Sequence, residues 1–211
     1  MLRKSEIHKL VNRDDPLILE IGCNDGTDTL GFLAEFSDGR IHCFECDPRA
    51  IQSFRLRISD ARCQLHEIAL SDRAGVETLH MSGGTMKGMP MKDWDQSSSL
   101  LEPTGHRSAY PSITFERTCK VETARLDDWA QRLIPDGVVD FVWMDVQGAE
   151  HLVIAGGPST FARTRFCYFE YSESELYRGQ RGLPALLSAL GPYRLLGTYE
   201  NNALAVNMEL A

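Results

Sequence analysis

An apolar run at residues 17–21 leads directly into a turn with two glycines, and this junction constrains the fold more than any other stretch of the chain. A short apolar run followed by Gly22, Gly26 and a helix-like stretch predicts a strand, a tight turn and the start of a helix. Glycine is needed where the backbone takes a positive φ or approaches a ligand closely. We therefore expect the first strand–helix turn of a nucleotide-binding α/β sheet, with a ligand on the turn and with Thr27 or Asp28 capping the helix.

The charges around this turn favour one class of ligand. A dinucleotide site needs G-x-G-x-x-G spacing and places its pyrophosphate at the helix start. Here Asp25 and Asp28 stand where that pyrophosphate would lie. Carboxylates repel phosphates, whereas a nucleoside that carries a positive sulfonium meets no such penalty. S-adenosylmethionine is therefore favoured over NAD or ATP, and a turn that binds no ligand stays an alternative.

A second run, residues 40–48, ends in further acids. It alternates β-branched or aromatic residues with polar ones and stops at Pro48, so it predicts the second strand. Glu45 follows Glu20 by 25 residues, close to where a doubly wound fold places a carboxylate that accepts both ribose hydroxyls. We expect Glu45 to bind a ribose. Asp47 is the alternative if the register differs by two residues, and a solvated acid without a ligand is another.

The composition is that of an ordinary globular chain with an acidic balance. Its 211 residues, 43% of them hydrophobic and 25% charged, fit one domain over residues 1–211. The net charge of -8 offers no basic surface for nucleic acid. No apolar run approaches the ~20 residues that a membrane helix needs, and residues 1–15 resemble a short amphipathic helix more than a signal sequence. We expect a cytoplasmic protein that binds neither nucleic acid nor membrane, of an oligomeric state that the sequence does not predict.

The six cysteines do not form a recognisable metal or redox set. Cys43 and Cys46 have C-x-x-C spacing, but residues three apart on a predicted strand point to opposite faces. No second pair of this kind completes a zinc site. We expect reduced thiols.

The remaining patterns predict alternating strands and helices, which is typical of a doubly wound sheet. Helices are expected at 1–15, 29–36, 49–60, 126–133, 151–155 and 183–190, and strands at 17–21, 40–48, 63–68, 76–81, 113–123, 138–145, 165–171, 193–199 and 203–207. In the helix at 126–133, Trp129 and Leu133 are expected to face inward. The last two strands are joined so tightly that they must be antiparallel. The predicted fold class is α/β: a single Rossmann-like (class I methyltransferase) domain whose seven-stranded, mostly parallel sheet has an antiparallel last strand and helices on both faces.

Residues 82–112 are the least regular segment. They are rich in glycine, proline, serine and methionine, and a loop of this length in a compact domain is usually functional or disordered. We expect either a lid over a small-molecule substrate or a mobile connection. His106 in this segment is a candidate base, although a lone loop histidine is more often solvated.

Several motifs in order resemble the FkbM family of S-adenosylmethionine-dependent methyltransferases over nearly the whole chain. They are Glu20-x-Gly22-x-Asn24-x-Gly26, Phe44-Glu45-Cys46-Asp47-Pro48, Ala69-Leu70-Ser71-Asp72, Ser98-Ser99-Leu100, Thr123 to Asp128, and Asp145-Val146-Gln147-Gly148-Ala149-Glu150 followed by Gly156-Gly157. Two positions depart from the family pattern. Gln147 replaces the usual Glu, so a role resting on that acid is in doubt, and Cys46 replaces the usual Pro.

The resemblance implies O-methylation of a hydroxyl on a small natural product or a sugar. The glycine turn, the second strand end and the motifs together predict the cofactor-binding residues Glu20, Gly22, Asn24, Asp25, Gly26, Glu45, Cys46, Ala69, Leu70 and Asp145. A methyltransferase-like domain that binds a nucleoside or a protein partner without catalysis is the alternative function.

Methyl transfer to an alcohol benefits from a positioned base. Asp145 ends a strand that is apolar on both faces and hence central, so it is the first candidate for base or acceptor-orienting group. His151 is the second candidate, and Glu150 and Glu170 are the other acids expected nearby. These acids would also suit a divalent cation, but no metal ligand is predicted because a sequence does not show convergence.

Overall fold

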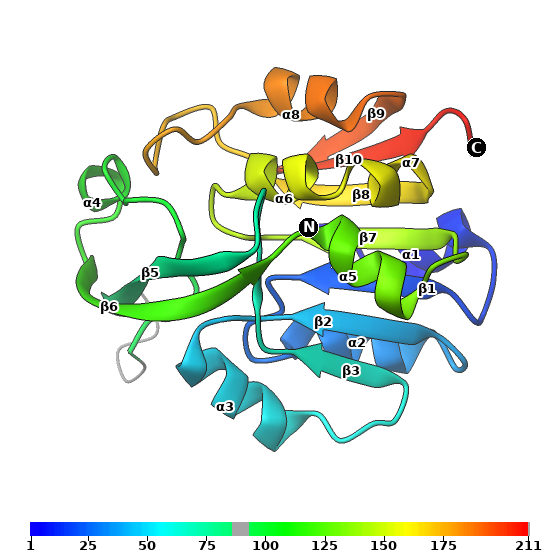
Figure 1. Cartoon of the computed structure of the whole chain (residues 1–211), viewed down its shortest axis with the longest axis horizontal. Coiled ribbons are helices and arrows are strands. Elements are labelled where there is room, and N and C mark those ends of the chain that lie inside the picture. The colour runs from blue at the N-terminus through cyan, green and yellow to red at the C-terminus, as the bar shows by residue number, and fades with distance from the viewer. Residues whose placement is uncertain (86–92, 211) are drawn as a thin grey trace.

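The computed structural model describes residues 1–85 and 93–210, which form a seven-stranded main sheet and a three-stranded second sheet. The main sheet runs in the order β3 (Cys63–His66), β2 (Arg40–Phe44), β1 (Leu17–Ile21), β7 (Val139–Met144), β8 (Thr164–Glu170), β10 (Asn202–Asn207) and β9 (Tyr193–Tyr199) (Figure 1). Strands β1, β2, β3, β7 and β8 are parallel, and β10 is antiparallel to both of its neighbours. The predicted class I methyltransferase sheet is confirmed.

Helices cover both faces of the main sheet, as predicted. On one face, α1 (Lys4–Val11), α2 (Thr27–Glu35) and α3 (Pro48–Arg57) bury Ile7, Phe32 and Phe54 against Ile18 and Phe141. On the other face lie α5 (Leu126–Leu133), α6 (Glu150–Gly156), α7 (Pro158–Ala162) and α8 (Leu183–Leu190), packed on Leu17, Leu19 and Ile21. Successive residues of a strand point to opposite faces, so β1 is apolar on both sides. Among the described residues, no helix is both long enough and apolar enough to span a membrane.

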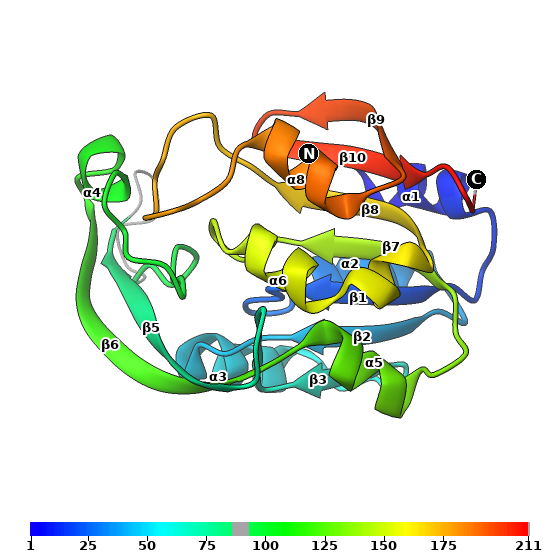
Figure 2. The ribbon, with the colours of Figure 1, turned by 45° about the horizontal axis from the view of Figure 1, so that its top comes forward.

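The second sheet is a feature that the sequence does not predict. Its strands run in the order β4 (Ala69–Leu70), β6 (Ile113–Ala124) and β5 (Gly75–Gly84), with β5 antiparallel to β6. It lies beyond the carboxyl ends of the parallel strands, next to the short helix α4 (His106–Ala109) (Figure 2). The two long strands therefore form a wall at the edge of the main sheet where ligands bind in this fold class.

Two local predictions are wrong. The N-cap of α2 is Gly26, with a φ of 80°, and neither Thr27 nor Asp28 caps the helix, because both lie in its first turn. The Asp25 carboxylate instead accepts the Thr27 amide at 3.2 Å. In α5, Trp129 is buried as expected, but Leu133, the last residue of the helix, is 49% exposed, and the C-cap Ile134 is buried in its place.

The segment 82–112 is partly structured. Within its described residues, Ser82 to Gly84 end β5, His106 begins α4, and Ser99 pairs with His80 as an isolated bridge. Ser97, Ser99 and His106 are buried. The methionines and the proline at 86–91 lie outside the described residues, so a lid at that position stays a prediction.

Candidate active site

Three cavities lie at the carboxyl ends of the central strands, and all of them are lined by Asp145, which follows β7. The apolar cavity is lined by residues that include Ile21, Phe44, Glu45, Cys46, Ile68, Ala69, Leu70, Leu79 and Leu100. The acidic cavity is lined by residues that include Gly22, Asn24, Asp25, Asp28, Glu45, Asp95 and Trp143. The aromatic cavity is lined by residues that include Trp94, His106, Tyr110, Gln147, Glu170, Tyr171 and Tyr177.

The glycine turn packs closely against the backbone that follows β7 and against side chains of α3 and the residue after it. Gly22 has a φ of +85°, and a Cβ atom there would lie 1.8 Å from the backbone oxygen of Asp145. Gly26 has a φ of +80°, and its Cβ would lie 2.9 Å from the Phe54 ring. Close packing inside the protein thus explains both glycines without a ligand. Gly22 nevertheless lines the apolar and acidic cavities, so the turn forms one wall of the site.

We predict that Gly22→Ala lowers the free energy of unfolding by about 3 kcal/mol or more, since the methyl group overlaps a backbone oxygen and the φ is unfavourable. Gly179→Ala is the matched control. Its φ is +77°, but nothing among the described residues lies within 4 Å of the added Cβ, so the cost should be about 1 kcal/mol. Denaturant unfolding of both variants measures the difference. Equal costs would show that the contact with Asp145 is unimportant.

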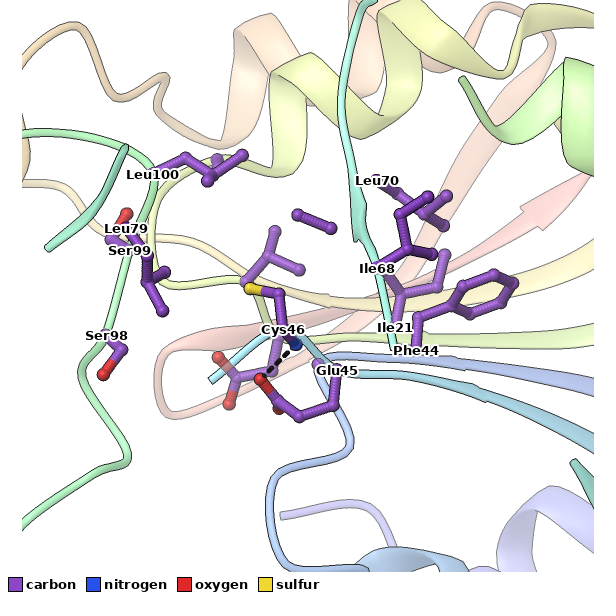
Figure 3. Close-up of a pocket in the computed structure, with 15 residues that line it drawn as sticks. Ile21, Phe44, Glu45, Cys46, Ile68, Leu70, Leu79, Ser98, Ser99 and Leu100 are labelled. Carbon is purple, nitrogen blue, oxygen red and sulfur yellow. Dashed lines mark hydrogen bonds between the residues drawn. The ribbon is translucent and has the colours of Figure 1, made fainter. Parts of the chain in front are cut away.

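Glu45 is the acid that faces the cavities from β2. Its Oε2 accepts the amide of Asn24 at 2.9 Å, and its Oε1 accepts the amides of Cys46 and Asp47 at 2.7 and 2.8 Å. Figure 3 shows the carboxylate at the base of the apolar cavity with the bond from Cys46. Burial raises the pKa of Glu45, although these amides favour its charged form. Asp47, the alternative, instead binds Arg49 and Ser98.

The apolar cavity has the shape and chemistry of a slot for a flat, weakly polar ring. Ile68 and Leu70 lie on one side of it and Leu79 and Leu100 on the other, above Glu45 (Figure 3). Six of the predicted cofactor-binding residues are brought together here: Gly22, Glu45, Cys46, Ala69, Leu70 and Asp145. Clefts of this kind, mostly apolar with a few placed polar groups, are typical small-molecule sites.

The acidic cavity suits a cationic ligand. The side-chain Oδ1 of Asn24 is buried there with no hydrogen-bond partner among the described residues, and a buried unpaired acceptor is costly unless a ligand donates to it. Asp25 and Asp28 also line the cavity and are paired with Arg57 and Lys4 at 2.9 and 2.8 Å. An ammonium group could donate to this unsatisfied acceptor, and the acidic wall suits a ligand with a positive charge.

Glu20 lies beneath the turn instead of in a cavity. It is 1% exposed, accepts the Thr29 hydroxyl at 2.6 Å, and lines none of the three cavities formed by the described residues. Burial raises the pKa of Glu20 to about 7. Direct contact of Glu20 with a cofactor stays a prediction, and in this structure the residue supports the glycine turn through α2.

This shift makes stability depend on pH. Because the pKa of Glu20 is about 7 in the folded chain and ordinarily 4.5, its stabilising proton is fully bound below pH 4.5, and the stabilisation is lost as the pH rises towards 7 and above. We predict that the free energy of unfolding of the parent falls between pH 5 and pH 8. The fall in Glu20→Gln should be smaller by roughly 2 kcal/mol. Denaturant unfolding at both pH values checks this, and equal changes would contradict it.

Asp145, Glu150 and Glu170 form an acidic cluster in which one oxygen from each lies within 4.8 Å of the others. Burial raises the pKa of Asp145, and burial together with the charge of Asp145 raises the pKa of Glu170 well above its usual range. Like charges this close favour one shared proton. The pKa of Glu170 is raised more strongly, so we expect this proton mainly on Glu170, which leaves Asp145 as the candidate base.

Glu150 and His151 are placed differently from Asp145. The Glu150 carboxylate is 1% exposed and accepts the amides of Val146 and Gly148 at 3.1 and 3.3 Å, so it braces the turn after β7. Burial raises its pKa to about 7. The described residues that line the three cavities include neither Glu150 nor His151. The structure thus brings Asp145 and Glu170 together in the aromatic cavity and leaves His151 outside it.

Gln147 has a role that the sequence reasoning missed. Its Nε2 donates to Asp145 at 2.7 Å and to Glu170 at 2.9 Å, while its Oε1 accepts the Tyr177 hydroxyl at 3.1 Å. The sequence marks Gln147 only as a missing carboxylate. Tyr177 lies in a stretch without a repeating pattern, and Trp94 in the irregular segment, so neither gave a signal. An amide that bridges two acids fixes their orientation.

Comparisons with known proteins agree with this geometry. A family model described as the methyltransferase FkbM domain matches residues 20–201. The 2-O-methyltransferase NoeI of Sinorhizobium fredii (strain NBRC 101917 / NGR234) is 42% identical over 210 residues, which are 97% of this chain and 85% of that protein. Among solved structures, cofactor-bound Rv0187 from MTB matches with a TM-score of 0.52 and 10% identity, over 97% of this chain and 78% of that one. At this low identity, the structural match shows the fold alone.

Proposed function

Because this chain belongs to the FkbM methyltransferase family and is an S-adenosylmethionine-dependent methyltransferase, we propose that it methylates a hydroxyl of a small polar acceptor, in particular a secondary hydroxyl of a sugar. The observation that supports this most is that one carboxylate, Asp145, lines the apolar, acidic and aromatic cavities together. A donor in the first two cavities and an acceptor in the third would meet beside it. The relative at 42% identity is a 2-O-methyltransferase, which agrees with a hydroxyl acceptor.

The residues present fit S-adenosylmethionine. The apolar cavity would hold the adenine, Glu45 the two ribose hydroxyls, and the acidic cavity the methionine end, where the unpartnered Oδ1 of Asn24 can accept from an ammonium. When bound, the cofactor supplies a methyl group already activated by its sulfonium. The protein's own contribution is to position the acceptor oxygen and to receive its proton.

The aromatic cavity fits a polyhydroxylated acceptor. Trp94, Tyr110 and Tyr171 offer flat apolar surfaces, and Asp145 and Glu170 offer oxygen atoms that accept from hydroxyls. Asp145 is the base in this proposal, because the shared proton is expected mainly on Glu170 and Gln147 hydrogen-bonds to both side chains.

The proposal is tested with S-adenosylmethionine and a panel of methyl glycosides of common hexoses, deoxyhexoses and pentoses. The parent protein is expected to form S-adenosylhomocysteine together with a glycoside that has gained a single O-methyl group, located by NMR. Asp145→Asn is the matched control and should form neither product at a comparable rate. Tight cofactor binding without transfer to any member of the panel would contradict the proposal and favour a binding domain without catalysis.

A further inference from the structure

His106 is a buried histidine in the wall of the aromatic cavity that the proposed transfer does not use. It is 4% exposed, and its ring lies 4.9 Å from that of Tyr110, 5.1 Å from that of Phe115 and 5.4 Å from that of Tyr177, measured between centroids. Its Nδ1 is buried and has no hydrogen-bond partner among the described residues. An unpaired buried nitrogen is unfavourable by itself, and His106 lines the aromatic cavity, so a ligand there that reaches the ring would relieve this cost.

The backbone holds this imidazole in a fixed position. The amides of Gly105 and His106 both donate to the carbonyl of Leu176, at 3.0 and 2.9 Å. A Cβ atom at Gly105 would lie 2.1 Å from the carbonyl oxygen of Glu175, so the two segments pack backbone against backbone. The start of α4 is thereby attached to the residues next to Tyr177, whose hydroxyl contacts Gln147. A ring fixed in this way can discriminate between ligands, because little conformational freedom is lost on binding.

The chemistry of the ring suits a hydroxyl group. Burial lowers the pKa of His106, so the imidazole is neutral at neutral pH and offers one donor and one acceptor nitrogen. A hydroxyl can satisfy either of them. The acids of the same cavity, Asp145 and Glu170, already offer acceptors to the hydroxyl that is methylated.

We propose that His106 is a specificity-determining residue that binds a second hydroxyl of the acceptor, so that the enzyme selects polyols over simple alcohols. This inference rests on the proposed function, since it assigns the aromatic cavity to the acceptor. A site whose buried polar group is satisfied only by a ligand hydroxyl rejects an analogue that lacks the hydroxyl.

The test compares the effect of removing a substrate hydroxyl in the parent with its effect in variants that lack the His106 ring nitrogens. The glycoside that the parent methylates is compared with its monodeoxy analogues, each lacking one hydroxyl that is not methylated, using the parent, His106→Phe and His106→Gln. His106→Phe keeps an aromatic ring against Tyr177 and Phe115, and His106→Gln keeps a donor and an acceptor. His80→Phe, on β5 outside the three cavities formed by the described residues, controls for the loss of a histidine.

For one analogue, the parent and His80→Phe are expected to lose about tenfold in kcat/KM relative to the full glycoside, mostly through KM. His106→Phe should lose less than about twofold on the same comparison, and His106→Gln should recover part of the discrimination. Calorimetric affinity for S-adenosylhomocysteine should be the same in all four proteins.

Two results would overturn the inference, and they are distinguishable. If the parent methylates a glycoside but His106→Phe discriminates against every analogue as strongly as the parent, the role of His106 is wrong while the proposed function holds. Glycoside binding is followed separately by NMR shifts of the His106 ring resonances. If the parent binds S-adenosylhomocysteine but neither methylates nor binds any glycoside, both proposals fail.

Discussion

Glu45→Ala is expected to weaken the binding of S-adenosylhomocysteine about 100-fold or more in a calorimetric titration. In the parent, three backbone amides hold the Glu45 carboxylate at the junction of the apolar and acidic cavities. Two hydroxyl bonds to a charged group contribute about 1.5–3 kcal/mol each, and the substitution removes both. Among the described residues, Glu45 belongs to no hydrophobic cluster, so the main sheet should stay folded in the variant, although three amides lose their acceptor.

Asp47→Asn is the matched control for Glu45→Ala. Asp47 is an acid two residues away that caps α3 by accepting the Arg49 amide at 3.0 Å and pairs with the Arg49 guanidinium. Because Asn caps a helix about as well as Asp, the cost should come from the weakened pair with Arg49, about 1 kcal/mol, and the affinity for S-adenosylhomocysteine should change by less than about threefold. The reverse pattern, with affinity lost in Asp47→Asn and kept in Glu45→Ala, would show that the ribose carboxylate has been assigned to the wrong acid.

Asp145→Asn should lower kcat for methyl transfer by about 10²–10⁴-fold, the range that a positioned base contributes. The amide keeps the size of the side chain but does not accept the acceptor's proton. Because burial raises the pKa of Asp145, the rate of the parent should also fall as the pH is lowered through that pKa, and this acid limb should be missing from the residual activity of the variant.

Glu170→Gln separates charge from geometry in the same cluster. Glu170 is expected to be protonated beside Asp145, so a neutral amide resembles its native state. The loss in kcat should be under about tenfold. Equal losses in Asp145→Asn and Glu170→Gln would show that the two acids act as one unit, and a larger loss in Glu170→Gln would move the base to Glu170.

The main sheet could be predicted because its strands are short apolar or alternating runs, most of which have a clear stop. Residues 193–199 match β9 at both ends, and Asp145 follows a strand that is buried along its whole length. The acids at strand ends then come together by topology, since parallel strands end at the same edge. This rule alone predicts that Glu45 and Asp145 lie at the edge of the sheet where the cavities are found.

The second sheet could not be predicted, because alternation indicates a strand without indicating its partner. The runs at 76–81 and 113–123 became β5 and β6, which pair with each other and turn away from the main sheet. The aromatic cavity depends on the same kind of long-range contact. The one Tyr177 hydroxyl proton, for example, is shared between Gln147 Oε1 and the carbonyl of Ser97, 80 residues earlier.

Gln147 shows the limit of judging a motif by its residue types. Because it departs from the family pattern, Gln147 suggested that a catalytic acid was missing from the site. In the structure its backbone has a φ of 54°, and its amide bridges the two acids that the proposed mechanism needs. The substitution therefore replaces repulsion between carboxylates with hydrogen bonds.

The central claim is that the apolar and acidic cavities hold S-adenosylmethionine beside Asp145. A crystal structure of the protein with S-adenosylhomocysteine tests it most directly. The expected result has the adenine between Leu70 and Leu100, both ribose hydroxyls on Glu45, and the sulfur facing the aromatic cavity past Asp145. A product molecule bound elsewhere, or with its ribose away from Glu45, would contradict the account.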